Sequence, residues 1–256
     1  MIFGIAWQTL LIVIPLLFVG GIVDAIAGGG GLITLPAYLI AGIPPHRAIA
    51  TNKLSVSIGA TASTARYIKN GYVDWALAVP SAILAALGAM LGARLILLIG
   101  DDVIRYFLLF VLPVVAFVVL RKRDFSASTL TPISRKRQAV IVCAASLVIG
   151  MYDGFYGPGT GTFLLLVFTQ LGHMSVENAS GNMKVANLAS GIGSLTVFLI
   201  NRQPIIVLGL IGSVANLAGH YIGSGMVVKN GARIVRPIIL VVLVLLFARV
   251  IMDLAG

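Results

Sequence analysis

Charge is scarce in this sequence of 256 residues. Only 10% of the residues are charged, against roughly a quarter in soluble domains, while 59% are hydrophobic. A soluble chain of this length could not bury so much apolar surface. Apolar runs at 5–27, 75–99, 104–120 and 237–249 approach or exceed the ~20 residues that cross a bilayer. We therefore expect an integral membrane protein.

Cysteine and the sequence motifs of soluble enzymes are also nearly missing. Cys143 is the only cysteine, which excludes an internal disulfide and a cysteine metal cluster and leaves packing as its expected role. The sequence has no HExxH, GxSxG or Walker A motif. Four glycines at 28–31 are no dinucleotide fingerprint, because no strand precedes them. We expect no cofactor, no metal and no enzymatic activity.

Acidic residues are rarer than basic ones, with 8 against 18 and a net charge of +10. This charge does not indicate nucleic-acid binding, because six of the 18 basic residues lie in one connector, at 121–123 and 135–137. Basic residues beside a span mark the cytoplasmic side and attract anionic lipids. The first 45 residues lack Lys and Arg, so they have no signal-peptide n-region and predict a first membrane helix. We expect an inner-membrane, multi-pass protein with the 121–137 linker in the cytoplasm.

The second half of the sequence repeats the charges and glycines of the first. Asp24 returns as Asp153 (153 − 24 = 129) and Lys53 as Lys184 (184 − 53 = 131). Glycines 28–31 are matched by the glycine-rich stretch 157–161. A duplicated, apolar chain broken by glycine is typical of a secondary transporter.

These features predict an all-α integral membrane protein of two repeats, 1–121 and 138–256, joined by the basic linker 122–137. The expected segments are 5–27, 31–42, 47–69, 74–99 and 103–121, followed by 138–156, 161–171, 177–200, 204–228 and 236–253. The second segment of each repeat, of ~11 residues, rises only ~17 Å and cannot cross a ~30 Å hydrocarbon core. Each repeat should therefore contain a broken or re-entrant helical hairpin and three transmembrane helices.

The distribution of basic residues favours inverted repeats. With the linker inside, the turn at Asp101 lies outside, whereas the corresponding turn at 228–236, which is basic, lies inside. Both termini then lie outside, and Arg47 and Arg202 are the residues that do not fit. The paired glycines Gly88 and Gly92, which return as Gly219 and Gly223, predict close helix contacts within the chain or in a homodimer.

The glycine-rich breaks predict an anion site. Unwound backbone is tolerated in a membrane only where it is buried in protein or lines an aqueous cavity. The helix after each break points free N–H groups and a positive dipole end toward that cavity. The expected anion-binding residues here are Gly29, Gly30, Gly31, Gly159, Thr160 and Gly161. The alternative is a tight helix contact that needs no side chains.

Four ionisable residues should lie at bilayer depth, where an unpaired charge is costly and functional roles are common. We expect Lys53 and Lys184 to bind a small oxyanion and Asp24 or Asp153 to carry a coupling proton. Alternatively, the aspartates only neutralise the lysines. Uncharged donors close to the lysines complete the expected anion site: Asn52, Asn182 and Asn187. His220 is either a proton relay or a helix-contact residue.

At these residues the chain resembles the sulfite exporter TauE/SafE family of bacterial and archaeal membrane permeases. The resemblance rests on 24–36, 42–45 and 48–53 in the first half and on 153–161 and 179–184 in the second. It implies transport of sulfite, a sulfonate or a related sulfur-containing anion, with export as the expected direction. One departure is Asn182, where the family pattern would have threonine.

Other functions stay open at this point. An uncoupled anion facilitator would use the same residues. An intramembrane enzyme acting on an anionic head group would need a nucleophile or base beside an arginine, and Arg94 and Arg105 have no such neighbour in the sequence. A scaffold subunit would explain the hydrophobicity but not the repeated charges.

Overall fold

The computed structural model describes residues 5–100, 133–231, 233–235 and 237–238. Eight helices make up this described part. They are α1 (Trp7–Ala27), α2 (Gly31–Ile40), α3 (Pro45–Lys69), α4 (Trp75–Leu97), α6 (Arg135–Phe155), α7 (Thr160–Gln170), α8 (Val176–Ile200) and α9 (Ile206–Asn230). The expected segment 103–121 and nearly all of 236–253 lie outside the described residues.

The helices agree with the expected segments to within a few residues. The largest difference is at α6, which begins at Arg135 and so includes the basic residues 135–137 that we had assigned to the linker. Ser134 explains this start, because its hydroxyl accepts a hydrogen bond from the backbone N–H of Arg137 and caps the helix. Basic residues therefore occupy the first turn of a membrane helix rather than a loop.

Two short helices follow the glycine-rich breaks, as the sequence predicts. α2 has 10 residues and α7 has 11, so neither can cross a bilayer alone. Gly28, with φ of 72°, ends α1, and Gly159, with φ of 83°, precedes α7. This left-handed conformation favours glycine because a Cβ would be strained there. Each short helix packs on the long helix before it, α2 on α1 and α7 on α6.

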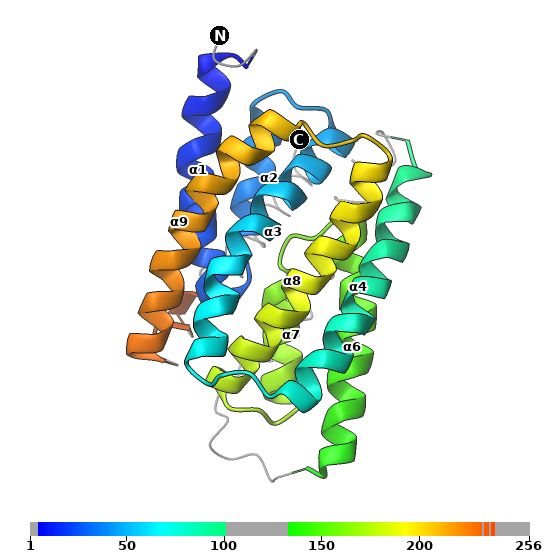
Figure 1. Cartoon of the computed structure of the whole chain (residues 1–256), viewed down its shortest axis with the longest axis vertical. Coiled ribbons are helices and arrows are strands. Elements are labelled where there is room, and N and C mark those ends of the chain that lie inside the picture. The colour runs from blue at the N-terminus through cyan, green and yellow to red at the C-terminus, as the bar shows by residue number, and fades with distance from the viewer. Residues whose placement is uncertain (1–4, 101–132, 232, 236, 239–256) are drawn as a thin grey trace, which may run out of the picture.

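The helices are arranged in two similar groups around a central pair (Figure 1). α3 and α8 contact each other; α9 packs on α3 and α1, while α4 packs on α8 and α6. In Figure 1, α1 runs downward and α6 upward, α3 downward and α8 upward, and α4 upward and α9 downward. Helices at corresponding places in the two halves therefore run in opposite directions.

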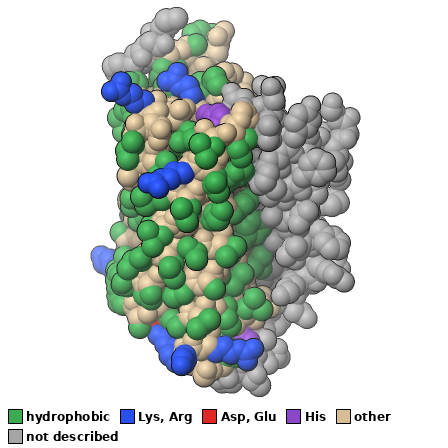
Figure 2. Space-filling model, turned by 90° about the vertical axis from the view of Figure 1, so that its right-hand side faces the viewer, with side chains coloured by type: hydrophobic (Ala, Val, Ile, Leu, Met, Phe, Trp, Pro, Cys, Tyr) green, Lys and Arg blue, Asp and Glu red, His purple; other side chains and the backbone are tan. Residues whose placement is uncertain are grey.

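Five of the described helices are long and apolar enough to cross a membrane: α1, α4, α6, α8 and α9. α3 is as long as α8, with 25 residues, but contains four Lys and Arg residues. Exposed apolar side chains lie along one side of α4 at Val79, Ile83, Leu87 and Leu91. Figure 2 shows hydrophobic side chains over the middle of one face, with most Lys and Arg toward its two ends. This pattern is that of a multi-pass membrane protein.

The repeated glycine pairs lie where long helices cross. A Cβ at Gly92 of α4 would overlap the carbonyl oxygen of Met151 in α6. A Cβ at Gly219 of α9 would likewise overlap the carbonyl oxygen of Phe18 in α1. Both pairs therefore serve helix contacts inside the chain, since small residues let two backbones approach.

Candidate functional site

The two glycine-rich breaks meet at the centre of the molecule. A Cβ at Gly28 would overlap the backbone of Gly161, so the two glycine-rich breaks touch backbone to backbone. The hydroxyl of Thr162 donates a 2.8 Å hydrogen bond to the carbonyl oxygen of Ala27. That carbonyl is one that the end of α1 leaves without a helical partner. The start of α7 thus stabilises the end of α1.

Two buried ion pairs flank this contact. Lys53 Nζ of α3 lies 2.8 Å from Asp153 Oδ1 of α6, and Lys184 Nζ of α8 lies 2.6 Å from Asp24 Oδ2 of α1. Each pair joins a lysine of one half to an aspartate of the other. All four residues are at most 7% exposed, and Lys184 is fully buried. The aspartates do neutralise the lysines, but across the two halves of the chain.

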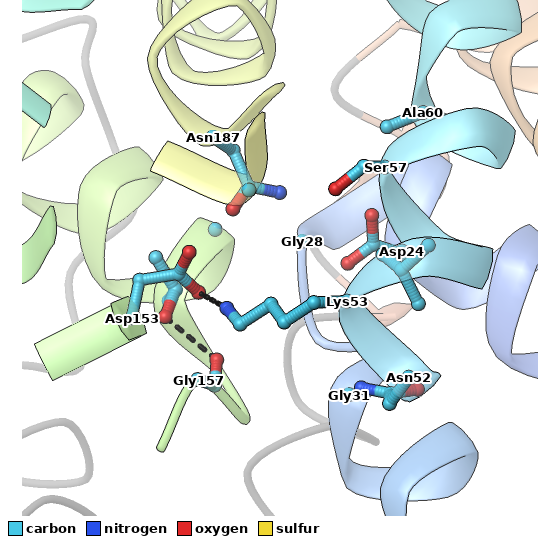
Figure 3. Close-up of a pocket in the computed structure, with 14 residues that line it drawn as sticks. Asp24, Gly28, Gly31, Asn52, Lys53, Ser57, Ala60, Asp153, Gly157 and Asn187 are labelled. Atoms are coloured by element: carbon cyan, nitrogen blue, oxygen red, sulfur yellow. Dashed lines mark hydrogen bonds and ion pairs between the residues drawn. The ribbon is translucent and has the colours of Figure 1, made fainter. Parts of the chain in front are cut away.

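A polar pocket opens beside the first of these pairs. The space not filled by atoms is about 450 Å³, and part of it is open to solvent. Its lining comes from α1, α2, α3, α6, α7 and α8: Asp24, Gly28, Gly31, Asn52, Lys53, Val56, Ser57, Ala60, Asp153, Gly157, Thr160, Gly161, Asn187 and Gly191. Figure 3 shows Lys53 reaching from α3 to Asp153, with Asn187 and Asp24 around the same space. One cation, amide and hydroxyl groups, and the first residues of α2 and α7 thus surround one pocket.

The sequence-based candidates divide into two sets. Eight of them line the pocket: Asp24, Asp153, Lys53, Asn52, Asn187, Gly31, Thr160 and Gly161. Five do not: Lys184, Asn182, Gly29, Gly30 and Gly159. The N–H of Gly30 already donates to Asp24 Oδ1 at 3.2 Å, and the amide of Asn182 donates to the carbonyl of Asn178. These N–H groups therefore form hydrogen bonds within the protein and do not face the pocket.

Several residues near the pocket were not expected from the sequence. Val56 and Ala60 follow Lys53 by three and seven positions, so they share its face of α3. Helical periodicity from Lys53 would have found them. Ser190 donates its hydroxyl to Asp153 Oδ2 at 2.8 Å, and no sequence signal indicates that contact.

The two aspartates differ in what surrounds them. Asp153 is held by Lys53 and the hydroxyl of Ser190. Asp24 is held by Lys184 and the N–H of Gly30, and His220 Nε2 lies 3.4 Å from its Oδ2 atom. The imidazole of His220 is fully buried. His220, which the sequence predicts to be a proton relay or a helix-contact residue, thus faces a carboxylate.

Charged groups of both signs line the pocket. Lys53 and the ends of α2 and α7 provide positive potential. Asp24 and Asp153 line the same pocket. Their carboxylates would repel an added anion strongly where water is scarce. For an anion to bind there, one of the two carboxylates would have to take up a proton. Among the described residues, no group of three His, Cys, Asp or Glu side chains could hold a metal ion.

Comparison with known proteins places the whole chain among membrane transporters. The sequence model of the family described as Sulfite exporter TauE/SafE matches residues 13–250. ORF9 of a Sinorhizobium species, a probable membrane transporter protein, is 34% identical over 97% of this chain and 95% of its own length. YfcA of Escherichia coli K12, also a probable membrane transporter protein, is 30% identical over 98% and 95%. A probable membrane transporter protein of Haemophilus influenzae is 31% identical over 92% of both chains. No solved structure matches the chain.

Proposed function

This chain belongs to the sulfite exporter TauE/SafE family of membrane transporters, and we propose that it exports a small sulfur-containing anion such as sulfite or an organosulfonate, coupled to a proton. The observation that carries this proposal is the position of Lys53. It is the cation that lines a pocket between membrane helices, at the point where two helix N-termini converge. The family's description supplies the sulfur-containing class of anion.

In this proposal the Lys53–Asp153 pair opens when the anion binds. The ammonium group turns from the carboxylate to the oxyanion, and Asn52 and Asn187 supply uncharged donors from the pocket wall. The start of α7 adds backbone N–H groups, which bind anions at helix N-termini. Lys184 has a different role, because it is fully buried and its ammonium group neutralises the carboxylate of Asp24.

Two inverted repeats would provide the alternating access that this transport needs. Corresponding helices run in opposite directions, and both buried ion pairs cross between the halves (Figure 1). Repeats related in this way place a site at mid-membrane and expose it to either side when one half rocks against the other. The contact of Gly28 with Gly161 is the place where the two hairpins would separate.

Exchange of labelled sulfite in proteoliposomes tests the anion site directly. We expect Lys53→Gln to abolish exchange, because the pocket loses its cation. Lys69→Gln is the matched control, since it removes a lysine from the exposed end of the same helix and should leave exchange intact. Exchange retained in Lys53→Gln would overturn the site. Wild-type protein that carries no sulfite or sulfoacetate would overturn the proposed anion but not the membership of the family.

Flux driven by a proton gradient separates a coupled carrier from a facilitator. A carrier of the proposed kind accumulates sulfite above equilibrium when protons flow with it. A facilitator with the same pocket would only equilibrate sulfite, whatever the gradient.

A further inference from the structure

We propose that the coupling proton binds between His220 Nε2 and Asp24 Oδ2, in one half of the molecule only. This inference rests on the proposed function, since it names the proton site of that carrier. His220 belongs to α9 and lies outside the residues that line the pocket. Asp24 connects His220 with the pocket, because its carboxylate lines the pocket and also faces the imidazole.

The hydrogen bonds around Ser63 are compatible with a His220 tautomer that carries its hydrogen on Nδ1. Ser63 Oγ lies 3.1 Å from the carbonyl oxygen of Ala60 and 2.9 Å from His220 Nδ1. A serine hydroxyl has a single hydrogen to donate. We infer that Ala60 receives that hydrogen, so that Ser63 accepts from Nδ1 of a neutral ring.

The other ring nitrogen then presents a lone pair to a carboxylate. His220 Nε2 is 3.4 Å from Asp24 Oδ2 and has no hydrogen-bond partner among the described residues. The ring is fully buried and therefore shielded from bulk solvent. Two acceptors face each other across this gap, and an unpaired buried acceptor is costly. A proton placed between them gives each a partner and turns repulsion into a charge-assisted hydrogen bond.

The charges that face His220 determine when this proton is stable. They are Asp24 from α1 and Lys184 from α8, while α3 contributes the hydroxyl of Ser63. Tyr67 of α3 also approaches Asp24, but its hydroxyl is engaged with the carbonyl of Ala25. With His220 neutral, Asp24 and Lys184 cancel each other. The added proton therefore leaves one net positive charge in a buried place, which is unfavourable by itself.

An anion in the pocket offsets that charge. The proton also removes part of the negative charge of Asp24, which would otherwise repel the anion. Each ligand thus favours binding of the other, and by linkage the effect is mutual. Proton and anion should move together in the same direction, so an inward proton gradient drives uptake and net export follows an outward gradient of the anion.

The repeated sequence restricts this site to one half. The offset of 131 residues that relates Lys53 to Lys184 relates His220 to Ala89 (220 − 131 = 89). Asp153 accordingly receives a hydroxyl from Ser190 and no imidazole. The two halves have therefore diverged: Lys53 and Asp153 face the anion, while Asp24 and His220 hold the proton.

Transport assays with three variants test this assignment. His220→Asn removes Nε2 but keeps an amide that can donate to Ser63. Ser63→Ala removes the hydroxyl that fixes the ring. Ser194→Ala is the matched control, because Ser194 corresponds to Ser63 (63 + 131 = 194), is equally buried and bonds only to carbonyls of its own helix. Two quantities are measured in proteoliposomes, sulfite exchange at equal pH and the ratio of sulfite uptake with and without an inward proton gradient.

We expect the gradient ratio of His220→Asn to fall to unity, and its exchange to need a higher sulfite concentration, because the anion loses the proton that favours its binding. Ser63→Ala should lower the ratio and shift the pH dependence of uptake, and Ser194→Ala should match the wild type. A wild-type ratio in His220→Asn would overturn the proton site, and so would a wild-type protein that exchanges sulfite but ignores the gradient. Loss of exchange in Lys53→Gln belongs to the anion site, so the two proposals fail separately.

A readout without any substrate uses the small number of histidines. The chain has three, so ¹⁵N histidine spectra of the purified protein are simple, and His220→Asn identifies the third signal. We expect His220 at neutral pH to carry its hydrogen on Nδ1, with Nε2 bare. Ser63→Ala should disturb that tautomer and Ser194→Ala should not. A hydrogen on Nε2 at neutral pH would overturn the proposal even if sulfite is not the anion.

Discussion

At the scale of single residues, the two lysines have nearly the same spacing from their glycine-rich breaks but different surroundings. Lys53 lies in the wall of the pocket, whereas Lys184 is fully buried against Asp24. A buried ion pair contributes little net stability, but removal of one partner leaves an uncompensated charge. Replacement of Lys184 is therefore expected to lower the stability of the protein more than replacement of Lys53.

We expect Lys184→Met to destabilise the protein by ~3–5 kcal/mol, the usual cost of stranding a buried charge. Thermal unfolding of the purified protein in detergent measures this loss. Lys53→Met should cost less, because the pocket gives Asp153 access to polar groups and water. Asp24→Asn combined with Lys184→Met should recover part of the stability. Equal losses for the two single lysine variants would contradict the difference in burial.

At the scale of elements, backbone contacts between glycine-bearing helices hold the two groups of helices together. α4 crosses α6 at Gly88 and Gly92, and α9 crosses α1 at Gly219 and Gly223. Lipid tails are as apolar as the helices, so such contacts depend on close packing rather than on hydrophobic burial. The crossings keep Asp24 and Asp153 at fixed positions near the ends of α1 and α6.

Gly92→Ala should weaken the crossing of α4 and α6 by about 1–3 kcal/mol, the usual cost of overpacking a tight contact. Its added methyl group meets the carbonyl of Met151, and backbone cannot move aside as a side chain can. Gly100→Ala is the control, because open space surrounds that position. Thermal unfolding of both variants gives the comparison, and similar melting temperatures would contradict the crossing.

At the scale of the whole molecule, helices at corresponding places in the two halves run in opposite directions (Figure 1). The turn between α3 and α4 and the turn between α8 and α9 lie at opposite ends in Figure 1. The first turn is flanked by Arg66 and Lys69, which favour the cytoplasmic side. The helices place the two turns at opposite ends of the molecule, and the basic residues favour the cytoplasmic side for the turn between α3 and α4.

Thiol labelling of intact cells tests that orientation. Cys143→Ser removes the only native cysteine, and new cysteines are then introduced singly at each turn. Arg202→Cys, between α8 and α9, should react with a membrane-impermeant maleimide from outside. Asn70→Cys, between α3 and α4, should react only after the membrane is opened. The reverse result would overturn the proposed orientation, and reaction of both from one side would contradict inverted repeats.

The sequence by itself determined the membrane class, the limits of most helices and the choice of four charged residues. Apolar runs, glycine breaks and repeated charges are local features, so they can be read along the chain without its fold. Resemblance to a family, carried by the same glycine-rich stretches, added the class of anion, and the match over residues 13–250 established the family.

Tertiary structure decided how those residues combine. Only the packing of α1 against α8 and α9 pairs Asp24 with Lys184 and His220. It also divides the expected anion site, bringing Asn52 and Asn187 to the pocket while Asn182 and Gly30 bond elsewhere. Such partners are more than a hundred residues apart in the sequence, as with Asp24 and Lys184 (184 − 24 = 160). Periodicity along one helix carries no information about which face of a distant helix it meets.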